Sequence, residues 1–256
     1  MSPHSATILI LTPMKNAAPH LARYFALLER LSYPHHLLSL GILEGDSDDD
    51  THERVARLMA DSCSGFADKQ LFRKHFGRVV PAHLPRHVEV YQSTRRAVLA
   101  RARNHLLFGA LRAQDWVLWL DADVIDYPPD IIERLIAFDL DIVHPHCVTD
   151  YGGKSFDRNA WVANGQTLME DLRGRERVRL DSVGGTMLLI RADRHRDGLV
   201  FPAFFYGAPS RWARRPHPMR GDLVGEIETE GLALMAKDMG LECWGLPDLE
   251  ILHAPV

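Results

Sequence analysis

The sequence predicts an α/β fold with a mostly parallel central sheet flanked by helices, arranged as one domain over residues 1–256. Short apolar runs alternate with helical patterns along the chain, and no internal repeat or low-complexity linker divides it. Apolar residues make up 46% and charged residues 25% of the 256 residues, a composition that excludes a mainly disordered chain.

Two strand–helix pairs are predicted at the N-terminus. The apolar runs 6–11 and 37–43 are typical of short strands, and a helix is expected from Thr51 to about Ala60. The helix after the first run is indicated by apolar residues three and four positions apart: Leu21, Tyr24, Phe25, Leu28 and Leu31.

The middle of the chain combines a long loop with the most apolar strand. Residues 61–92 are basic and contain prolines and histidines, so we expect an irregular loop. A long helix is predicted from Ser93, and residues 116–120 (WVLWL) are typical of a strand covered on both faces. Pro128 and Pro129 suit the start of a short helix.

In the last part of the chain, residues 141–146, 186–190 and 249–253 predict strands. Residues 225–239 predict a helix, and residues 150–180 are polar and receive no assignment.

Charge and cysteine content narrow the functional classes. Thirty basic and 34 acidic residues give a net charge of −4, so no bulk field attracts nucleic acid. Three separated cysteines without a CxxC spacing argue against a disulfide framework or a zinc knuckle. No stretch approaches the roughly 20 apolar residues of a membrane span, and we expect a soluble, cytoplasmic protein.

Two carboxylates follow the buried strand 116–120. Asp121 and Asp123 are placed where open α/β sheets bind ligands, and hard oxygen ligands suit Mn²⁺ or Mg²⁺. A turn in which the aspartates bond to local N–H groups is the alternative. His253 ends the last predicted strand and is either a third ligand or a partly buried histidine.

Six blocks of the chain, spread over nearly its whole length, follow one another in the order of a known family. They are residues 8–13 (ILILTP) with Tyr24 and Phe25, 101–104 (RARN), 116–123 (WVLWLDAD), 181–186 (DSVGGT), 226–231 (EIETEG), and 244–247 (WGLP) with His253. In these blocks the chain resembles the fungal mannan-polymerase family of Golgi α-mannosyltransferases.

The resemblance implies a GT-A glycosyltransferase that uses GDP-mannose and Mn²⁺ and retains the anomeric configuration. By position, Asp121 and Asp123 match the family's DxD acids, and His253 matches its C-terminal metal ligand. Fungal members carry an N-terminal membrane anchor, whereas this chain starts close to its first strand. We therefore expect an anchor-free, bacterial member that acts on a glycan or lipid-linked acceptor.

The nucleotide sugar is expected to contact residues at the strand ends and on the basic face of the long helix. The expected set is Thr12, Pro13, Glu44, Asp46, Arg101, Arg103, Asp121, Ala122, Gly184 and Gly185. The arginines equally suit a solvated helix face, and the glycines equally suit a tight turn. For Glu44 and Asp46 the alternative is a solvated loop before a helix.

Glu226, Glu228 and Glu230 are expected in the first turns of the helix 225–239, where the helix dipole also favours acids. We select Glu228 and Glu230 as contacts of the acceptor hydroxyl or the sugar. Asp181 is a candidate nucleophile or orienting residue, although a front-face substitution, in which the leaving phosphate helps to deprotonate the acceptor, needs no nucleophile.

Other features allow alternative interpretations. The aromatic segment 201–206, with Trp161 and Trp212, either stacks on sugar rings or packs in the core. Arginines between 211 and 220 suggest a lid or a peripheral membrane contact, and an oligomer is compatible with the sequence. The competing functions are a nucleotidyltransferase, which the lack of a GxxxxGK[ST] loop disfavours, and a non-catalytic subunit of a glycosyltransferase complex.

Overall fold

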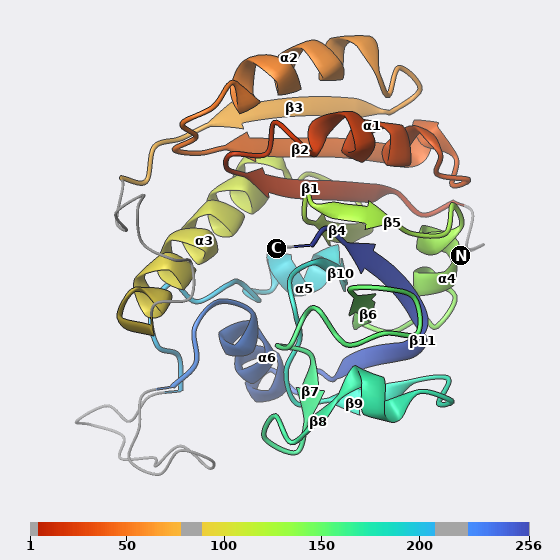
Figure 1. The fold of residues 1–256 in the computed structure, drawn as a ribbon, viewed down its shortest axis with the longest axis vertical. Helices are drawn as coiled ribbons and strands as arrows, with labels where there is room; N and C mark the ends of the chain where they lie inside the picture. Colours follow the sequence, from red (N-terminus) through yellow and green to blue (C-terminus); the bar gives the residue numbers. More distant parts are fainter. Residues whose placement is uncertain (1–4, 78–88, 208–224, 256) are drawn as a thin grey trace.

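The computed structural model describes residues 5–77, 89–207 and 225–255, and Figure 1 shows a central sheet with helices on both sides. The strands are β1 (Ile8–Met14), β2 (Leu38–Glu44), β3 (Asp68–Arg73), β4 (Trp116–Leu120), β5 (Val124–Asp126), β6 (Ile142–Val148), β7 (Trp161–Val162), β8 (Thr167–Leu168), β9 (Val178–Leu180), β10 (Met187–Arg191) and β11 (Cys243–His253). The α-helices are α1 (Leu21–Glu29), α2 (Thr51–Asp61), α3 (Glu89–Ala110), α4 (Ile131–Ile136), α5 (Ala192–Arg196) and α6 (Glu228–Asp238).

The main sheet has the strand order β3-β2-β1-β4-β10-β6-β11-β5, and β9 pairs with β11 beside that path. Strands β3, β2, β1 and β4 pair with one another in parallel, and β6 is parallel to β11. Strands β5, β9 and β10 are antiparallel to their partners. The predicted α/β class with a mostly parallel sheet is therefore confirmed.

Alternating side chains of the central strands supply two apolar clusters. Ile8 and Ile10 of β1 pack on the side of α1, α2 and α4, whereas Leu9 and Leu11 pack on the side of α3 and α6. No residue of β4 is more than 4% exposed, so this strand is covered on both faces as its uninterrupted apolar sequence predicts. None of the described helices is long and apolar enough to cross a bilayer.

The parallel strands end at a common edge of the sheet, and this edge positions the candidate site. β4 reaches it at Leu120, directly before the two aspartates, and β11 reaches it at His253. β10 runs in the opposite direction, so residues 184–186 arrive at the same edge before that strand begins. The Asp121 N–H donates to the Thr186 carbonyl at 2.9 Å and joins the two segments.

Three expectations about secondary structure are wrong. The stretch 61–92 contains the strand β3 and the start of α3, at Glu89 rather than Ser93. β3 is an edge strand whose residues are exposed or half-buried, so its apolar pattern is weak. The helix expected from Gly225 begins at Glu228, because Glu226 exchanges two backbone hydrogen bonds with Tyr206 instead.

Candidate functional site

Asp123 and His253 meet at the sheet edge although they come from distant parts of the chain. His253 Nε2 lies 3.1 Å from Asp123 Oδ1. The Ala254 N–H donates to the Asp123 carbonyl at 2.8 Å, and Val124 pairs with His253, so the backbone fixes the two residues together. The Asp123 side chain remains 35% exposed and the His253 side chain 7% exposed, which leaves the pair reachable from one side.

The surroundings of His253 define which ring nitrogen faces Asp123. Nδ1 lies 2.6 Å from the Ala254 carbonyl and therefore donates its proton there, while the ring stacks on Phe156 at 3.5 Å. Although burial opposes charge on both groups, their attraction lowers the pKa of Asp123 and raises that of His253. In metal-binding histidines one ring N–H donates to a carbonyl or carboxylate and the other nitrogen is left for the ion; the Nδ1–Ala254 bond leaves Nε2 as that other nitrogen.

Arg103 is a buried centre that joins three segments of the chain. Its Nη2 lies 3.2 Å from Asp121 Oδ1 and donates to the Gly185 carbonyl at 3.2 Å. Its Nε lies 3.1 Å from Glu228 Oε1. The guanidinium also lies over the Trp119 ring, with Cζ 5.5 Å from the ring centroid. The structure therefore brings together the predicted residues Arg103, Asp121, Gly185 and Glu228.

The electrostatics of this cluster favour an added positive charge. Burial raises the pKa of Asp121 to about 7; Arg103 opposes that change, and the carboxylates of Asp123, Asp157 and Glu228 reinforce it. Carboxylates thus outnumber the guanidinium beside them. Groups perturbed in this way, at a ligand-binding edge of a sheet, are typical of functional sites.

Asp157 belongs to this cluster and was missed by the sequence analysis. Its Oδ2 accepts the N–H of Gly185 at 2.9 Å and the Thr186 hydroxyl at 3.0 Å, and it lies 3.6 Å from His144 Nε2. Although burial works to raise it, these partners hold the pKa of Asp157 well below its usual range. Asp157 lies in the polar stretch without a periodic pattern, so no signal in the sequence marks it.

Gly184 and Gly185 leave room for protein side chains. A Cβ on Gly184 would lie 1.8 Å from Asp157 Oδ2, and one on Gly185 would lie 2.4 Å from Arg103 Nη2. Packing against Asp157 and Arg103 therefore requires glycine at both positions. Their contact with a nucleotide stays a prediction.

The three glutamates near the start of α6 have different surroundings. Glu228 is buried at φ +61°, in the left-handed region, and its N–H donates to the Pro202 carbonyl at 2.9 Å. Glu230 forms an ion pair with Arg96 at 2.8 Å and keeps 11% of its side chain exposed. Because α6 begins after Glu226, that residue does not share a helix face with Glu230.

Several predicted nucleotide contacts are already bonded within the protein. The fully buried Thr12 hydroxyl lies 2.6 Å from the Tyr24 hydroxyl. The buried Glu44 carboxylate lies 3.2 Å from Arg73 Nε, and Asp46 accepts the Phe76 N–H at 2.9 Å. Thr12 therefore faces the interior, and Glu44 and Asp46 hold the loops that follow β2 and β3.

Arg101 and Asp181 do not take part in the contacts around Arg103. Residues two apart on a helix project about 200° from each other, and the exposed Arg101 instead lies over the Phe76 ring at 6.0 Å. Asp181 is exposed, and its Oδ2 accepts the Ala163 N–H at 2.8 Å. Pro13 is half-buried within β1, and Ala122 is buried between the two aspartates.

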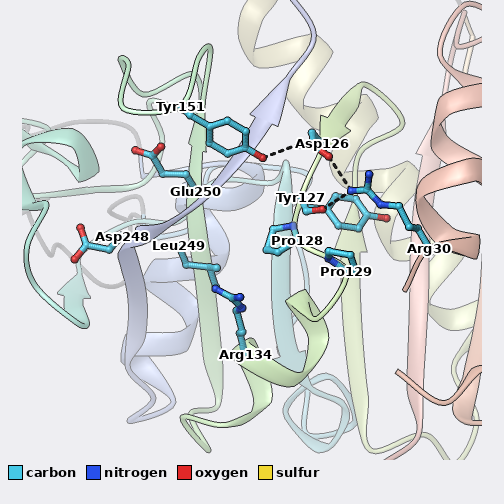
Figure 2. A pocket seen from close by; sticks show the side chains of 10 residues that line it. All are labelled: Arg30, Asp126, Tyr127, Pro128, Pro129, Arg134, Tyr151, Asp248, Leu249 and Glu250. Atoms are coloured by element: carbon cyan, nitrogen blue, oxygen red, sulfur yellow. Dashed lines mark hydrogen bonds and ion pairs between the residues drawn. The ribbon is translucent and has the colours of Figure 1, made fainter. Parts of the chain in front are cut away.

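A cavity of about 510 Å³ lies apart from these residues, between β5, the middle of β11 and the end of α1. Figure 2 shows Arg30 and the Tyr151 hydroxyl both in contact with the Asp126 carboxylate on its wall, at 2.8 and 2.9 Å. Glu250, on its wall, is paired with Arg173 at 2.8 Å. These charged groups on the cavity wall are thus already paired within the protein, and we therefore place the candidate site at the sheet edge despite the size of the cavity.

The expected metal ligands are partly assembled. Within the described part of the chain, no three His, Cys, Asp or Glu side chains are grouped closely enough to hold a metal ion. Asp123 and His253 form a close pair, and the Asp121 carboxylate points to Arg103. The chemistry of the donors fits a divalent cation, since a carboxylate oxygen of Asp123 and the Nε2 of His253 are ligands that Mn²⁺ accepts.

A family profile described as Anp1 matches residues 2–172 and 165–205. The chain belongs to the Anp1 family. It is 30% identical, over 96% of its length, to the mannan polymerase II complex anp1 subunit of Schizosaccharomyces pombe, and 28% identical over the same share to the ANP1 subunit of Saccharomyces cerevisiae. It spans 63% and 54% of those two relatives. These Anp1 relatives are fungal, and the expectation of a bacterial member is not borne out.

Solved structures identify the fold of this Anp1 member. One is the mannosyltransferase PcManGT from Pyrobaculum calidifontis, in complex with GDP-Man and Mn²⁺. It superposes with a TM-score of 0.59 and is 16% identical in sequence, and the match covers 97% of this chain and 57% of the PcManGT chain. The structure of GalNAc-T7 with UDP, GalNAc and Mn²⁺ superposes with a TM-score of 0.60 at 14% sequence identity. This match covers 97% of this chain and 44% of the GalNAc-T7 chain. The fold is that of the GT-A glycosyltransferases, as expected. Trp212 and the arginines between 211 and 220 lie outside the described residues.

Proposed function

We propose that this chain is the catalytic part of a metal-dependent, retaining glycosyltransferase that transfers mannose from GDP-mannose to a glycan or lipid-linked acceptor. The observation that carries the proposal is the Asp123–His253 pair at the ligand-binding edge of the sheet. The names of the relatives, which are mannan polymerase subunits, support the sugar. The complex of PcManGT with GDP-Man and Mn²⁺ supports the donor and the ion.

In this proposal Asp123 and His253 hold a Mn²⁺ or Mg²⁺ ion. The bound ion supplies Lewis-acid neutralisation of the diphosphate leaving group. Arg103 fixes the Asp121 carboxylate beside the ion site, and Asp157 fixes the turn 184–186 against it. These residues orient the donor rather than exchange protons with it.

The acceptor side of the proposal involves the start of α6. Glu230, which pairs with Arg96, is the more accessible of the two selected glutamates; in this proposal it accepts a hydrogen bond from an acceptor hydroxyl, and Glu228 orients Arg103. In a front-face substitution the departing diphosphate takes the acceptor proton, so retention needs no protein nucleophile. Asp181 remains the alternative nucleophile.

The test is thermal stabilisation by GDP together with Mn²⁺. We expect a rise in Tm for the wild type that is lost in Asp123→Ala, because one of the two close ligands is removed. Asp126→Ala is the matched control: it removes a carboxylate three residues away, on β5, and should leave the rise intact. Equal stabilisation of all three proteins, or of none, would contradict the proposed site.

A second candidate is a non-catalytic subunit, and one observation favours it: the relatives are named as subunits of complexes. Measuring the release of GDP from GDP-mannose by the isolated chain distinguishes a catalytic chain from a non-catalytic subunit. A catalytic chain releases GDP in a manner that depends on Asp123. A nucleotidyltransferase would instead release pyrophosphate from GTP and a sugar phosphate.

A further inference from the structure

The aromatic segment 201–206 is fixed at both ends. The Phe201 ring is buried against Trp119, with centroids 4.9 Å apart. Its backbone N–H and carbonyl both bond to the Asn104 side chain, at 3.0 and 2.7 Å. At the other end, Tyr206 exchanges two backbone hydrogen bonds of 2.8 Å with Glu226, and its hydroxyl donates to Asp238 at 3.0 Å.

Two phenyl rings between these fixed ends face solvent. Phe204 is 70% exposed and Phe205 is 40% exposed. A ring this exposed gains little from the hydrophobic effect in the folded chain. Because the backbone on each side is anchored, the exposure is a property of the fold, and neighbouring exposed aromatics of this kind indicate a contact surface.

The position of the segment indicates what it contacts. The Pro202 carbonyl accepts the Glu228 N–H at 2.9 Å, and the Arg103 guanidinium lies 5.2 Å from the Phe201 ring centroid. In Figure 1 the segment after α5 passes between α3 and the start of α6. The backbone that carries the two exposed rings therefore follows directly on residues that contact Arg103 and Glu228.

We propose that Phe204 and Phe205 form a stacking surface for a sugar ring of the acceptor; this inference rests on the proposed function. One face of a hexose presents C–H groups that pack flat on an aromatic ring, while its hydroxyls bond to polar groups at the edge. Two uncharged phenyl rings suit a neutral sugar better than the phosphates of the donor. Glu230, in the first turn of α6, supplies the polar edge.

The experiment measures binding of mannotetraose to the protein in the presence of GDP and Mn²⁺, by saturation-transfer NMR and titration. Phe204→Ala should weaken binding about tenfold, the size expected for the loss of one stacked ring. Phe204→Trp should retain binding, and Phe204→Leu should not, because stacking requires an aromatic face. The matched control is Phe108→Ala, a phenyl ring on α3 that is 66% exposed and should have no effect.

Each outcome decides the inference. Unchanged affinity in Phe204→Ala, or an equal loss in Phe108→Ala, overturns it. A change in GDP affinity without a change in mannotetraose affinity would mark the rings as a cover for the donor and also overturns it. Glycan binding that depends on Phe204, in a protein that GDP and Mn²⁺ fail to stabilise, would refute the proposed function while supporting the stacking surface.

Discussion

Two acidic segments of this protein contain the same residue type in different settings. Asp121 and Asp123 follow the central strand β4 and contact Arg103 and His253, which come from distant parts of the chain. The segment 44–50 follows β2, near the edge of the sheet, and several of its carboxylates bond to close neighbours in sequence. Asp50, for example, pairs with Arg54 one helical turn away at 2.8 Å.

The difference follows from where each segment lies in the sheet. The Asp121 side chain, after β4, is only 28% exposed, and burial raises its pKa to about 7. The exposed Asp50 has a pKa lowered mainly by its hydrogen bond with Arg54. Charges interact more strongly where water is excluded. Replacing a charged residue should therefore lower the free energy of unfolding more in the buried cluster than in the segment 44–50.

The largest effect is expected from Arg103→Ala. It removes the guanidinium that faces both Asp121 and Glu228, and breaking a buried pair of this kind costs about 3–5 kcal/mol of unfolding free energy. Urea denaturation measures the loss. Arg101→Ala, on the exposed side of α3, is the control and should change the free energy by less than about 0.5 kcal/mol.

If Arg103→Ala is too unstable to purify, Arg103→Lys is the alternative. Lysine keeps the charge but cannot contact Asp121 and Glu228 together, so its free energy of unfolding should lie between those of the wild type and Arg103→Ala. Equal stabilities of the Arg101 and Arg103 variants would show that the cluster is no more sensitive than the surface.

The next largest effect is a pH-dependent loss of stability caused by His195, whose ring packs against β4, the strand that precedes Asp121. Trp119 Nε1 donates to His195 Nε2 at 3.3 Å, and His195 Nδ1 lies 2.6 Å from the Leu199 carbonyl, so the ring is neutral. Burial lowers the pKa of His195 to about 4. The unfolded chain takes up this proton near pH 6.5, and the folded chain only near pH 4.

Because the folded pKa lies below the unfolded one, the contribution of His195 is complete above pH 6.5 and is lost between pH 6.5 and 4. The expected loss is about 3 kcal/mol. Urea denaturation at a series of pH values measures it, against His195→Gln, which lacks this titration. Parallel pH profiles for the two proteins would contradict a buried neutral histidine.

The sequence is most informative where a pattern is local. The buried strand 116–120 is found at the predicted bounds, and the position of Asp121 and Asp123 after it is confirmed, because an uninterrupted apolar run identifies a covered strand. β3 was missed, since the half-exposed residues of an edge strand carry little apolar pattern.

The site itself depends on contacts between distant segments. The resemblance identified His253, whereas residue spacing did not place it beside Asp123. Asp157 has no local signal, because its role comes from the turn 184–186 that it contacts. Arg101 and Arg103 look equivalent in sequence, and only their directions from α3 separate them.

The smallest effect is expected in the segment 44–50. The Asp49 carboxylate accepts the Thr51 N–H at 3.1 Å and the Ala18 N–H at 3.3 Å, and so ties the start of α2 to the loop after β1. Thr51 Oγ1 also accepts the Ala17 N–H at 2.8 Å, so part of this connection survives without Asp49. Asp49→Ala should therefore cost about 1 kcal/mol, the usual net value for a lost hydrogen bond between a side chain and the backbone. Asp49→Asn, which keeps an acceptor oxygen, should cost less.

Thermal and urea denaturation of both variants beside Arg103→Ala test the contrast directly. A loss in Asp49→Ala as large as that in Arg103→Ala would mean that proximity to the central strand does not set the sensitivity of a carboxylate contact.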